Sequence, residues 1–439
     1  MKFIFINERL LKFFFLLLPL SYCIGQAAVS LIFIFFSILF FICNKNISFF
    51  YDDIIKRLLI LYFFSLILGS FFSLNIKESL YSSVTLIRFF IFFLALDLFS
   101  DIFKKKIQNK FFLWSFLLAF LIMLDAYYQY FNPLKEDIFG FKADKANLGR
   151  LTSIFKDELI VGSVLYNLFY TSLLFLIFFI NKKLKFLKFY NNYLILFLLL
   201  LYLIAVFLTG DRMPFIMTVS TFFLTIIFLK NFRYKFSVAL IFFLFFFVFQ
   251  ILNNKYYSDR YKSFISNVDI KIDNIEGVVK KKTFLDSQWG SHFLTGYQIF
   301  KNNFYFGVGL KQFKIECSNE IYENINSDFR KGRCSNHPHN IYIEMISETG
   351  VFSTIILLSI ILFFFIRCLK VIFNKKFKFY YDNIEYVLFI SFFLLNVLTF
   401  FPLRSSGSFF SNFAGSLIWY NLSFLFIYLK HFENILKKN

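Results

Sequence analysis

The sequence is short of charged residues, of proline and of metal-binding motifs. Only 17% of its 439 residues are charged and 59% are hydrophobic, whereas a soluble domain has roughly 25% charged and 45–50% apolar residues. This balance excludes a soluble enzyme and a disordered chain. Neither an Asp-x-Asp pair nor a zinc-type spacing of Cys and His occurs. We therefore expect no cofactor and no bound metal.

Long apolar runs bounded by charge dominate what is present. A helix that crosses a bilayer needs roughly 20 mostly apolar residues, and it must be continuous because lipid offers the backbone no hydrogen-bond partners. Such runs fall near residues 10–25, 28–43, 58–74, 82–99, 111–130, 160–180, 192–209, 213–229, 236–252, 341–366, 384–401 and 410–429. The sequence therefore predicts an all-α, polytopic membrane protein with about twelve transmembrane helices.

The positions of the basic residues indicate an orientation. Lysine and arginine concentrate in the cytoplasmic loops of membrane proteins. If the N-terminus lies inside, the inner segments carry 25 of the 47 basic residues and the short outer loops carry 8. The net charge of +20 is thus a topology signal and gives no indication of nucleic-acid binding. We expect a bacterial inner-membrane protein, surrounded by membrane lipid, with both termini in the cytoplasm.

This topology divides the chain into three parts. Residues 1–252 are predicted to form transmembrane helices 1–9, with an outer loop near 131–159. Residues 253–340 form one large periplasmic loop, and residues 341–439 form helices 10–12. All five prolines fall on or near the outer face, and three of the four histidines lie in the large loop. The outer face is therefore where we expect the chemistry.

Two cysteines of the large loop are candidates for a disulfide. Cys317 and Cys334 enclose sixteen residues and would face an oxidising compartment in the periplasm. A disulfide would stabilise a loop of this size by about 3 kcal/mol in the entropy model. The alternative is a pair of free thiols.

The densest polar cluster of the chain ends the large loop. Pro338 fixes the backbone between His337 and His339, and Asn340 directly precedes a predicted membrane helix. Helix N-termini attract anions, and histidine is suited to transfer protons near neutral pH. The cluster is therefore a candidate active site, and the alternative is a helix-capping turn whose histidines only contact water.

Three arginines lie where an anionic substrate could reach them. Arg212 lies in a very short outer turn, and its planar guanidinium suits phosphate; the alternative is an arginine paired with Asp211. Arg150 ends the first outer loop, where its charge could equally be neutralised by its neighbours. Arg88 lies in the outer half of a predicted span, where a charge is costly and functional by default, with Asp125 as a candidate partner.

Several of these stretches resemble the O-antigen ligase and O-antigen polymerase superfamily of bacterial envelope enzymes. The hallmark of that family is His-Asn, nine residues, then Gly-x-x-small. It is matched by His339-Asn340, Gly350 and Ser353, although many members have glycine in place of Ser353. The turn that carries Arg212 looks like the arginine-bearing turn of the family.

Two further stretches are similar to the family. Phe304 to Phe313, with Gly307-Val308-Gly309, is similar to the glycine-containing stretch of its large outer loop, and Phe401 to Phe410 is similar to a segment of some members. The family usually has a second essential arginine in the large loop. Here Arg260 lies early in the loop and His292 lies nearer the expected place, which leaves a two-arginine site open.

The resemblance implies a metal-independent glycosyltransferase at the outer face of the inner membrane. Its donor would be a glycan linked to undecaprenyl diphosphate, and its acceptor a hydroxyl of lipid A–core or of another glycan, in lipopolysaccharide biosynthesis. The implied catalytic residues are His339 and Arg212. The implied substrate-binding residues are Arg88, Arg150, His292, His337 and Asn340.

Two alternatives remain open at the level of the sequence. The O-antigen ligase joins a finished chain to lipid A–core, whereas the polymerase extends the chain, and we favour the ligase. The other alternative is a lipid-linked sugar flippase or transporter. Transporters tend to show internal repeats and polar sites at the midplane of the membrane, whereas this chain shows no obvious repeat and gathers its polar residues outside.

Overall fold

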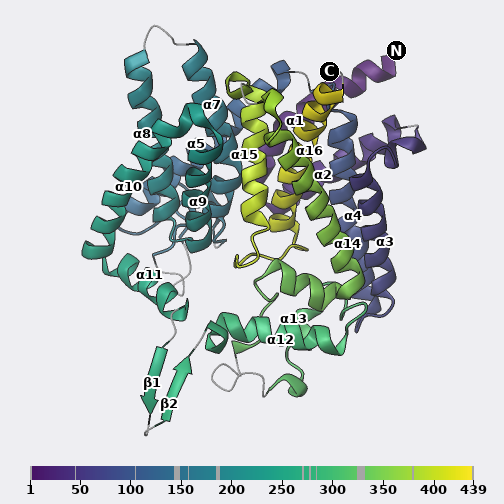
Figure 1. Ribbon diagram of the computed structural model, residues 1–439, viewed down its shortest axis with the longest axis vertical. Coiled ribbons are helices and arrows are strands. Elements are labelled where there is room, and N and C mark those ends of the chain that lie inside the picture. Colours follow the sequence, from purple (N-terminus) through teal and green to yellow (C-terminus); the bar gives the residue numbers. More distant parts are fainter. Residues whose placement is uncertain are drawn as a thin grey trace.

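The structure, a computed structural model, is a bundle of long helices (Figure 1). It describes residues 2–44, 46–103, 105–142, 149–156, 158–183, 188–268, 271–275, 278–282, 284–323, 332–377 and 380–437. Part of the predicted outer loop, residues 143–148 and 157, lies outside the described residues.

The helices of the N-terminal part follow the predicted apolar runs. They are α1 (Lys2–Ile24), α2 (Gln26–Cys43), α3 (Ile54–Ser70), α4 (Ile76–Leu98), α5 (Lys105–Phe131), α6 (Val161–Val164), the π-helical turn η4 (Leu165–Phe169), α7 (Tyr170–Lys183), α8 (Lys188–Leu208), α9 (Arg212–Phe228) and α10 (Arg233–Asn253). The segment α6–η4–α7 is one continuous rod. A π-turn of this kind is rare and often marks a functional site.

The rest of the chain contains shorter elements before three more long helices. They are α11 (Lys255–Val268), β1 (Lys271–Ile275), β2 (Val278–Lys282), α12 (Gln288–Asn302), α13 (Phe313–Glu316), α14 (Ile341–Ile372), α15 (Ile384–Thr399) and α16 (Asn412–Lys437). The two strands form an antiparallel hairpin in which Lys271 pairs with Lys282.

Each predicted span coincides with a helix, and the all-α polytopic membrane fold is confirmed. Among the described residues, eight helices are long and apolar enough to cross a membrane, and α9 and α15 are shorter apolar helices. The remaining predicted spans correspond to α1 and α3. The eight long helices by themselves do not reach the predicted number of about twelve.

Phenylalanine fills both the interior and the outer surface of the bundle. Phe33 stacks on Phe92 with 3.8 Å between ring centroids, and Phe392 stacks on Phe424 at 5.1 Å. Helix α10, by contrast, has only 17% of its apolar window buried. A helix that exposes apolar side chains along its length is suited to face lipid.

The two ends of the bundle differ in what they carry. Both termini lie at the top of Figure 1, and we call this the terminal end. The segment from α11 to α13 lies at the opposite end, which we call the loop end, and α12 packs against α14 there. The turn between α8 and α9 and the start of α14 also lie at the loop end.

Candidate functional site

Three histidines meet at the loop end of the bundle. The ring centroid of His339 lies 4.3 Å from that of His337 and 5.4 Å from that of His292, which belongs to α12. Trp289, also in α12, places its ring edge-on to His339 at 4.9 Å. The structure thus joins the predicted pair before α14 to the third histidine of the large loop.

Backbone carbonyl groups hold two of the three imidazoles. His292 Nδ1 donates to Arg333 O at 2.9 Å, and His337 Nε2 donates to Ser406 O at 3.1 Å. Ser406 N also donates to His339 O at 2.8 Å, and His339 has a left-handed backbone with φ of 58°. A non-glycine residue in this conformation persists only where its surroundings impose it, most often at functional sites.

Burial keeps the histidine cluster uncharged. Burial, together with the neighbouring His337 and His292, lowers the pKa of His339 to about 3. Burial also lowers the pKa of His337 and of His292. Each imidazole is therefore neutral near pH 7 and can accept a proton, and a bound anion would raise these pKa values.

Asn340 holds the start of α14 and a neighbouring loop together. Its Oδ1 accepts hydrogen bonds from the backbone of Tyr342 and Ile343, which is the geometry of a helix N-cap. Its Nδ2 donates to Pro402 O at 2.8 Å and to Arg404 O at 3.3 Å. The amide therefore positions the backbone at His339, and contact of Asn340 with substrate stays a prediction.

The glycine of the predicted hallmark motif has a structural explanation. Gly350 interrupts α14 with φ of 68° and ψ of −174°, a conformation essentially restricted to glycine. A Cβ atom there would collide with the backbone of Tyr305 and Phe306. Val351 N donates to Phe304 O at 2.9 Å. Gly350 is therefore where the glycine-containing stretch of the large loop docks on α14.

Two carboxylates that the sequence analysis missed strengthen this arrangement. Glu344 and Glu348 lie one turn apart on α14, each with only 1% of its surface exposed. Glu344 accepts from the Ser408 hydroxyl and from Phe409 N, and Glu348 accepts from Lys311 N at 2.8 Å. Acidic residues inside an otherwise apolar helix were the signal that could have found them.

Three arginines gather at the turn between α8 and α9. Arg150 forms an ion pair with Asp211, and Arg260 Nε donates to Gly210 O at 2.7 Å. Arg212 follows directly and has both Arg150 and Arg260 as electrostatic neighbours. Burial raises the pKa of Asp211, while the positive charge of Arg150 opposes that shift. We call Arg150, Arg212 and Arg260 the arginine cluster.

The arginine cluster differs from the predicted set in two ways. Asp211, considered as a partner of Arg212 in that turn, forms an ion pair with Arg150. Arg260, which lies early in the large loop and left the second arginine of the site open, joins the cluster from α11. Helix α11 folds back over the turn, and nothing in the local sequence signals that contact.

Arg88 lies in the middle of α4. Its Nη2 donates to Asn412 Oδ1 at 2.7 Å, and its guanidinium lies over the Phe89 ring. Helix α4 is on the opposite side of the bundle from α8, α10 and α11 (Figure 1). Asp125 accepts from Ile138 N at 3.0 Å and from the Ser153 hydroxyl, so its predicted pairing with Arg88 is not formed.

The structure pairs Cys317 with Cys334 as a disulfide, with 5.3 Å between the Cα atoms. That separation lies within the usual range for a disulfide. Cys317 is fully buried in a small apolar core that also contains Phe313 and Tyr322. The bond therefore fastens α13 to the chain just before the histidine cluster.

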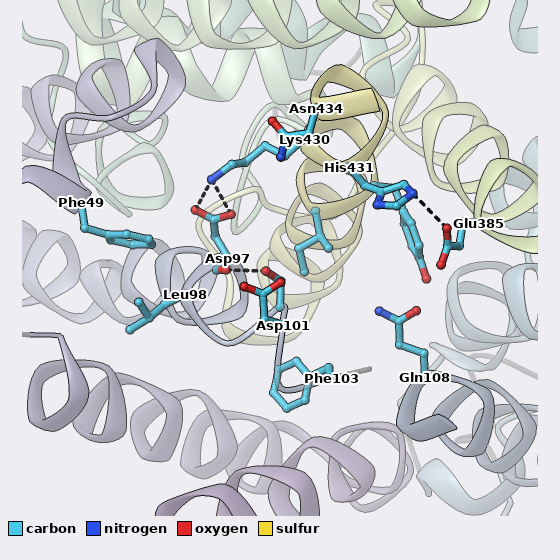
Figure 2. Close-up of a pocket in the computed structure, with 13 residues that line it drawn as sticks. Phe49, Asp97, Leu98, Asp101, Phe103, Gln108, Glu385, Lys430, His431 and Asn434 are labelled. Atoms are coloured by element: carbon cyan, nitrogen blue, oxygen red, sulfur yellow. Dashed lines mark hydrogen bonds and ion pairs between the residues drawn. The ribbon is translucent and has the colours of Figure 1, made fainter. Parts of the chain in front are cut away.

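A polar cavity of about 490 Å³ lies at the terminal end (Figure 2). Its lining includes Asp97, which accepts from Lys430 Nζ at 2.9 Å, and His431, whose Nε2 lies 2.9 Å from Glu385 Oε2. The charged groups of this cavity mostly face one another. None of the predicted site residues lines it.

The fold and the site define a class: a polytopic helical membrane protein that gathers buried and half-buried histidines and arginines at one end. Residues 195–358 match a family model described as O-Antigen ligase. The match covers this segment of the chain and supports the resemblance to the O-antigen ligase and polymerase superfamily, whose members are glycosyltransferase-like enzymes. The matched segment contains Arg212, Arg260, His292 and His339. No curated protein matches the chain.

Proposed function

We propose that the protein is a glycosyltransferase that moves a glycan from undecaprenyl diphosphate to a hydroxyl of lipid A–core, as an O-antigen ligase does. In this proposal it lies in the bacterial inner membrane with both termini in the cytoplasm and residues 253–340 in the periplasm. The observation that carries the proposal is the arginine cluster, placed at the same end of the bundle as the histidine cluster.

The arginine cluster would bind the diphosphate of the donor. Guanidinium groups form bidentate, charge-assisted hydrogen bonds with phosphate oxygens. During transfer the bond between the sugar and the diphosphate breaks, and negative charge accumulates on the departing oxygen. Arg212 and Arg260 would stabilise that charge, which is the kind of preorganised electrostatic effect that contributes most to many enzymes. We expect the reaction to need no metal.

His339 would act on the acceptor. The neutral imidazole accepts the proton of the attacking hydroxyl while the hydroxyl oxygen forms the new bond to the sugar. A pKa of about 3 makes His339 a weak base in the unliganded protein, and the charge of a bound diphosphate would raise that pKa toward the working range. His292 and His337 would orient the ring of His339 and contact the substrate.

A deletion strain tests the proposal and separates it from its alternative. Loss of a ligase leaves long lipid-linked chains and bare lipid A–core, whereas loss of a polymerase leaves core that carries a single repeat. Complementation by the wild-type gene should restore the long chains on lipid A–core. Complementation by Arg212→Ala or His339→Ala should fail although the variants accumulate normally in the membrane; full activity of either variant would contradict the assignment.

A further inference from the structure

The rod α6–η4 connects the arginine cluster to the neighbourhood of the histidine cluster. At its start, Gly162 N donates to Asp211 Oδ2 at 3.1 Å, so the rod touches the carboxylate that holds Arg150. Tyr166 follows four residues later and is the electrostatic neighbour of Arg404. Four residues of helix span about 6 Å. The arginine cluster and Arg404 therefore approach the same short stretch of backbone.

Arg404 belongs to the loop that holds the histidines. Its backbone carbonyl accepts from Asn340 Nδ2 at 3.3 Å. Two residues later, Ser406 uses its backbone O and N to hold the His337 ring and the His339 backbone. A group bound at Arg404 is thus next to the backbone that fixes the proposed base.

The guanidinium of Arg404 is only partly satisfied within the protein. Its Nη1 donates to Thr399 O at 3.0 Å, at the C-terminal end of α15. Its Nε is buried without a hydrogen-bond partner, and no carboxylate of the described residues forms an ion pair with it. Burial lowers the pKa of Arg404, and the hydroxyl of Tyr166 opposes this shift. A partly buried cation without a paired anion is costly, and an anionic ligand would remove that cost.

We propose that Arg404 is a donor-binding residue in addition to the arginine cluster. It binds the phosphate nearest the transferred sugar and holds that phosphate between the arginine cluster and His339. This inference rests on the proposed function, because it concerns the same diphosphate-linked donor. It adds a contact from the C-terminal part of the chain, outside the segment 195–358 that matches the family model.

A purely structural role for Arg404 is the rival explanation, since its Nη1 caps α15. The chain offers a matched control for that role. Arg233 Nε donates to Ile226 O at 3.0 Å near the end of α9, at the terminal end of the bundle and far from the site. Arg233→Gln removes a comparable contact to a helix carbonyl without touching the proposed donor site.

The experiment measures the thermal shift that inorganic pyrophosphate produces in the purified full-length protein. Wild type and Arg233→Gln should be stabilised alike. Arg404→Gln should weaken pyrophosphate binding by about tenfold or more, as expected for the loss of a hydrogen bond to a charged group. If Arg404→Gln does not fold, Arg404→Lys should keep the charge, lose the planar fork and still bind pyrophosphate more weakly than wild type.

Pyrophosphate binding by Arg404→Gln, or by Arg404→Lys, that equals binding by wild type overturns the inference. Arg212→Gln in the same assay distinguishes this failure from failure of the proposed function. If Arg212→Gln loses binding and the Arg404 variants keep it, only the inference fails. If pyrophosphate does not stabilise wild type at all, the diphosphate site itself is wrong, and both fail together.

Discussion

The two ends of the bundle treat positive charge in opposite ways. At the terminal end, cations lie directly against carboxylates. Lys56 is fully buried, and its Nζ lies 2.6 Å from Asp97 and 2.9 Å from Asp52. Arg367 contacts Asp53 at 2.8 Å and Glu433 at 2.5 Å. These pairs connect α3, α4, α14 and α16, and each of these cations is neutralised by carboxylates of the protein itself.

At the loop end, cations lie beside other cations, and the Asp211 carboxylate, paired with Arg150, lies among them. Arg212 has Arg150 and Arg260 as neighbours of the same sign, and Arg404 has no ion pair among the described residues. Like charges held together cost folding energy, and strongly perturbed charged groups cluster at functional sites. The difference between the two ends shows that the sign of the neighbouring charges separates basic residues that stabilise the fold from basic residues that could bind an anionic ligand.

The largest effect should come from breaking a pair at the terminal end. Asp97→Asn removes the buried partner of Lys56 and leaves only the more exposed carboxylate of Asp52 beside it. Breaking a buried ion pair typically costs about 3–5 kcal/mol. Denaturation of the purified protein should show this loss in the free energy of unfolding, with donor affinity per folded molecule unchanged.

Asp101→Asn is the matched control for Asp97→Asn. Asp101 lines the same cavity but is exposed, so its substitution should change the free energy of unfolding by about 0.5 kcal/mol or less. Equal effects of the two substitutions would remove the distinction between paired and unpaired charges on which the comparison depends.

The next effect concerns the arginine cluster. Arg212→Gln should reduce the transfer rate about 10²–10³-fold, which is the usual cost of removing one donor that stabilises transition-state charge. Its melting temperature should change little, because relief of repulsion from two like charges offsets the loss of the other contacts of the side chain. Arg57→Gln, which removes an exposed arginine bonded to Tyr51 O at the terminal end, should leave the rate unchanged. A stability loss without a rate loss in Arg212→Gln would assign this arginine to the fold.

A third prediction separates backbone strain from loop docking. Gly350→Ala should cost about 1–3 kcal/mol for the backbone conformation and should also lower activity, because the added Cβ displaces the stretch at Tyr305 and Phe306. Gly25→Ala is the control, since Gly25 also has a positive φ of 129° but nothing within 4 Å of the added Cβ. If both variants keep full activity, the docking of the large loop does not support the site.

The last prediction is a pH dependence of stability. Because the pKa of His339 is lowered to about 3 in the folded protein, the unfolded chain binds a proton there first, near its ordinary value of about 6.5. Folding is therefore undisturbed above about pH 6.5 and loses stability as the pH falls toward 3. His339→Gln should flatten this acid-side loss in unfolding measurements at pH 7, 6, 5 and 4. An unchanged slope would mean that His339 is not held neutral by burial.

The sequence predicted the fold well because a membrane helix is a local feature. Each apolar run near 20 residues is bounded by charge, and each became a helix where it was expected. The motif from His339 to Gly350 was equally predictable from the sequence, since its residues follow one another along one turn and one helix. For such local patterns, the nearby sequence is sufficient to determine the structure.

The composition of the site was only partly predictable because it depends on distant contacts. Arg260 reaches Gly210 across fifty residues, and His292 reaches His339 through the packing of α12 on α14. Arg88 was expected at the same site, and its hydrogen bond goes to Asn412 at the start of α16, more than three hundred residues away. No pattern in a single sequence specifies which loops of a helical bundle meet.

The central claim is that the cations of the loop end serve a diphosphate-linked glycan donor. The direct test is transfer by the purified protein in detergent, with an undecaprenyl-diphosphate-linked glycan as donor and lipid A–core as acceptor. The account predicts lipid A–core that carries the glycan, together with released undecaprenyl diphosphate, and loss of both products in Arg212→Gln and His339→Ala. Absence of any product, with the intact lipid-linked glycan crossing the bilayer when the protein is placed in vesicles, would contradict the account and support a flippase.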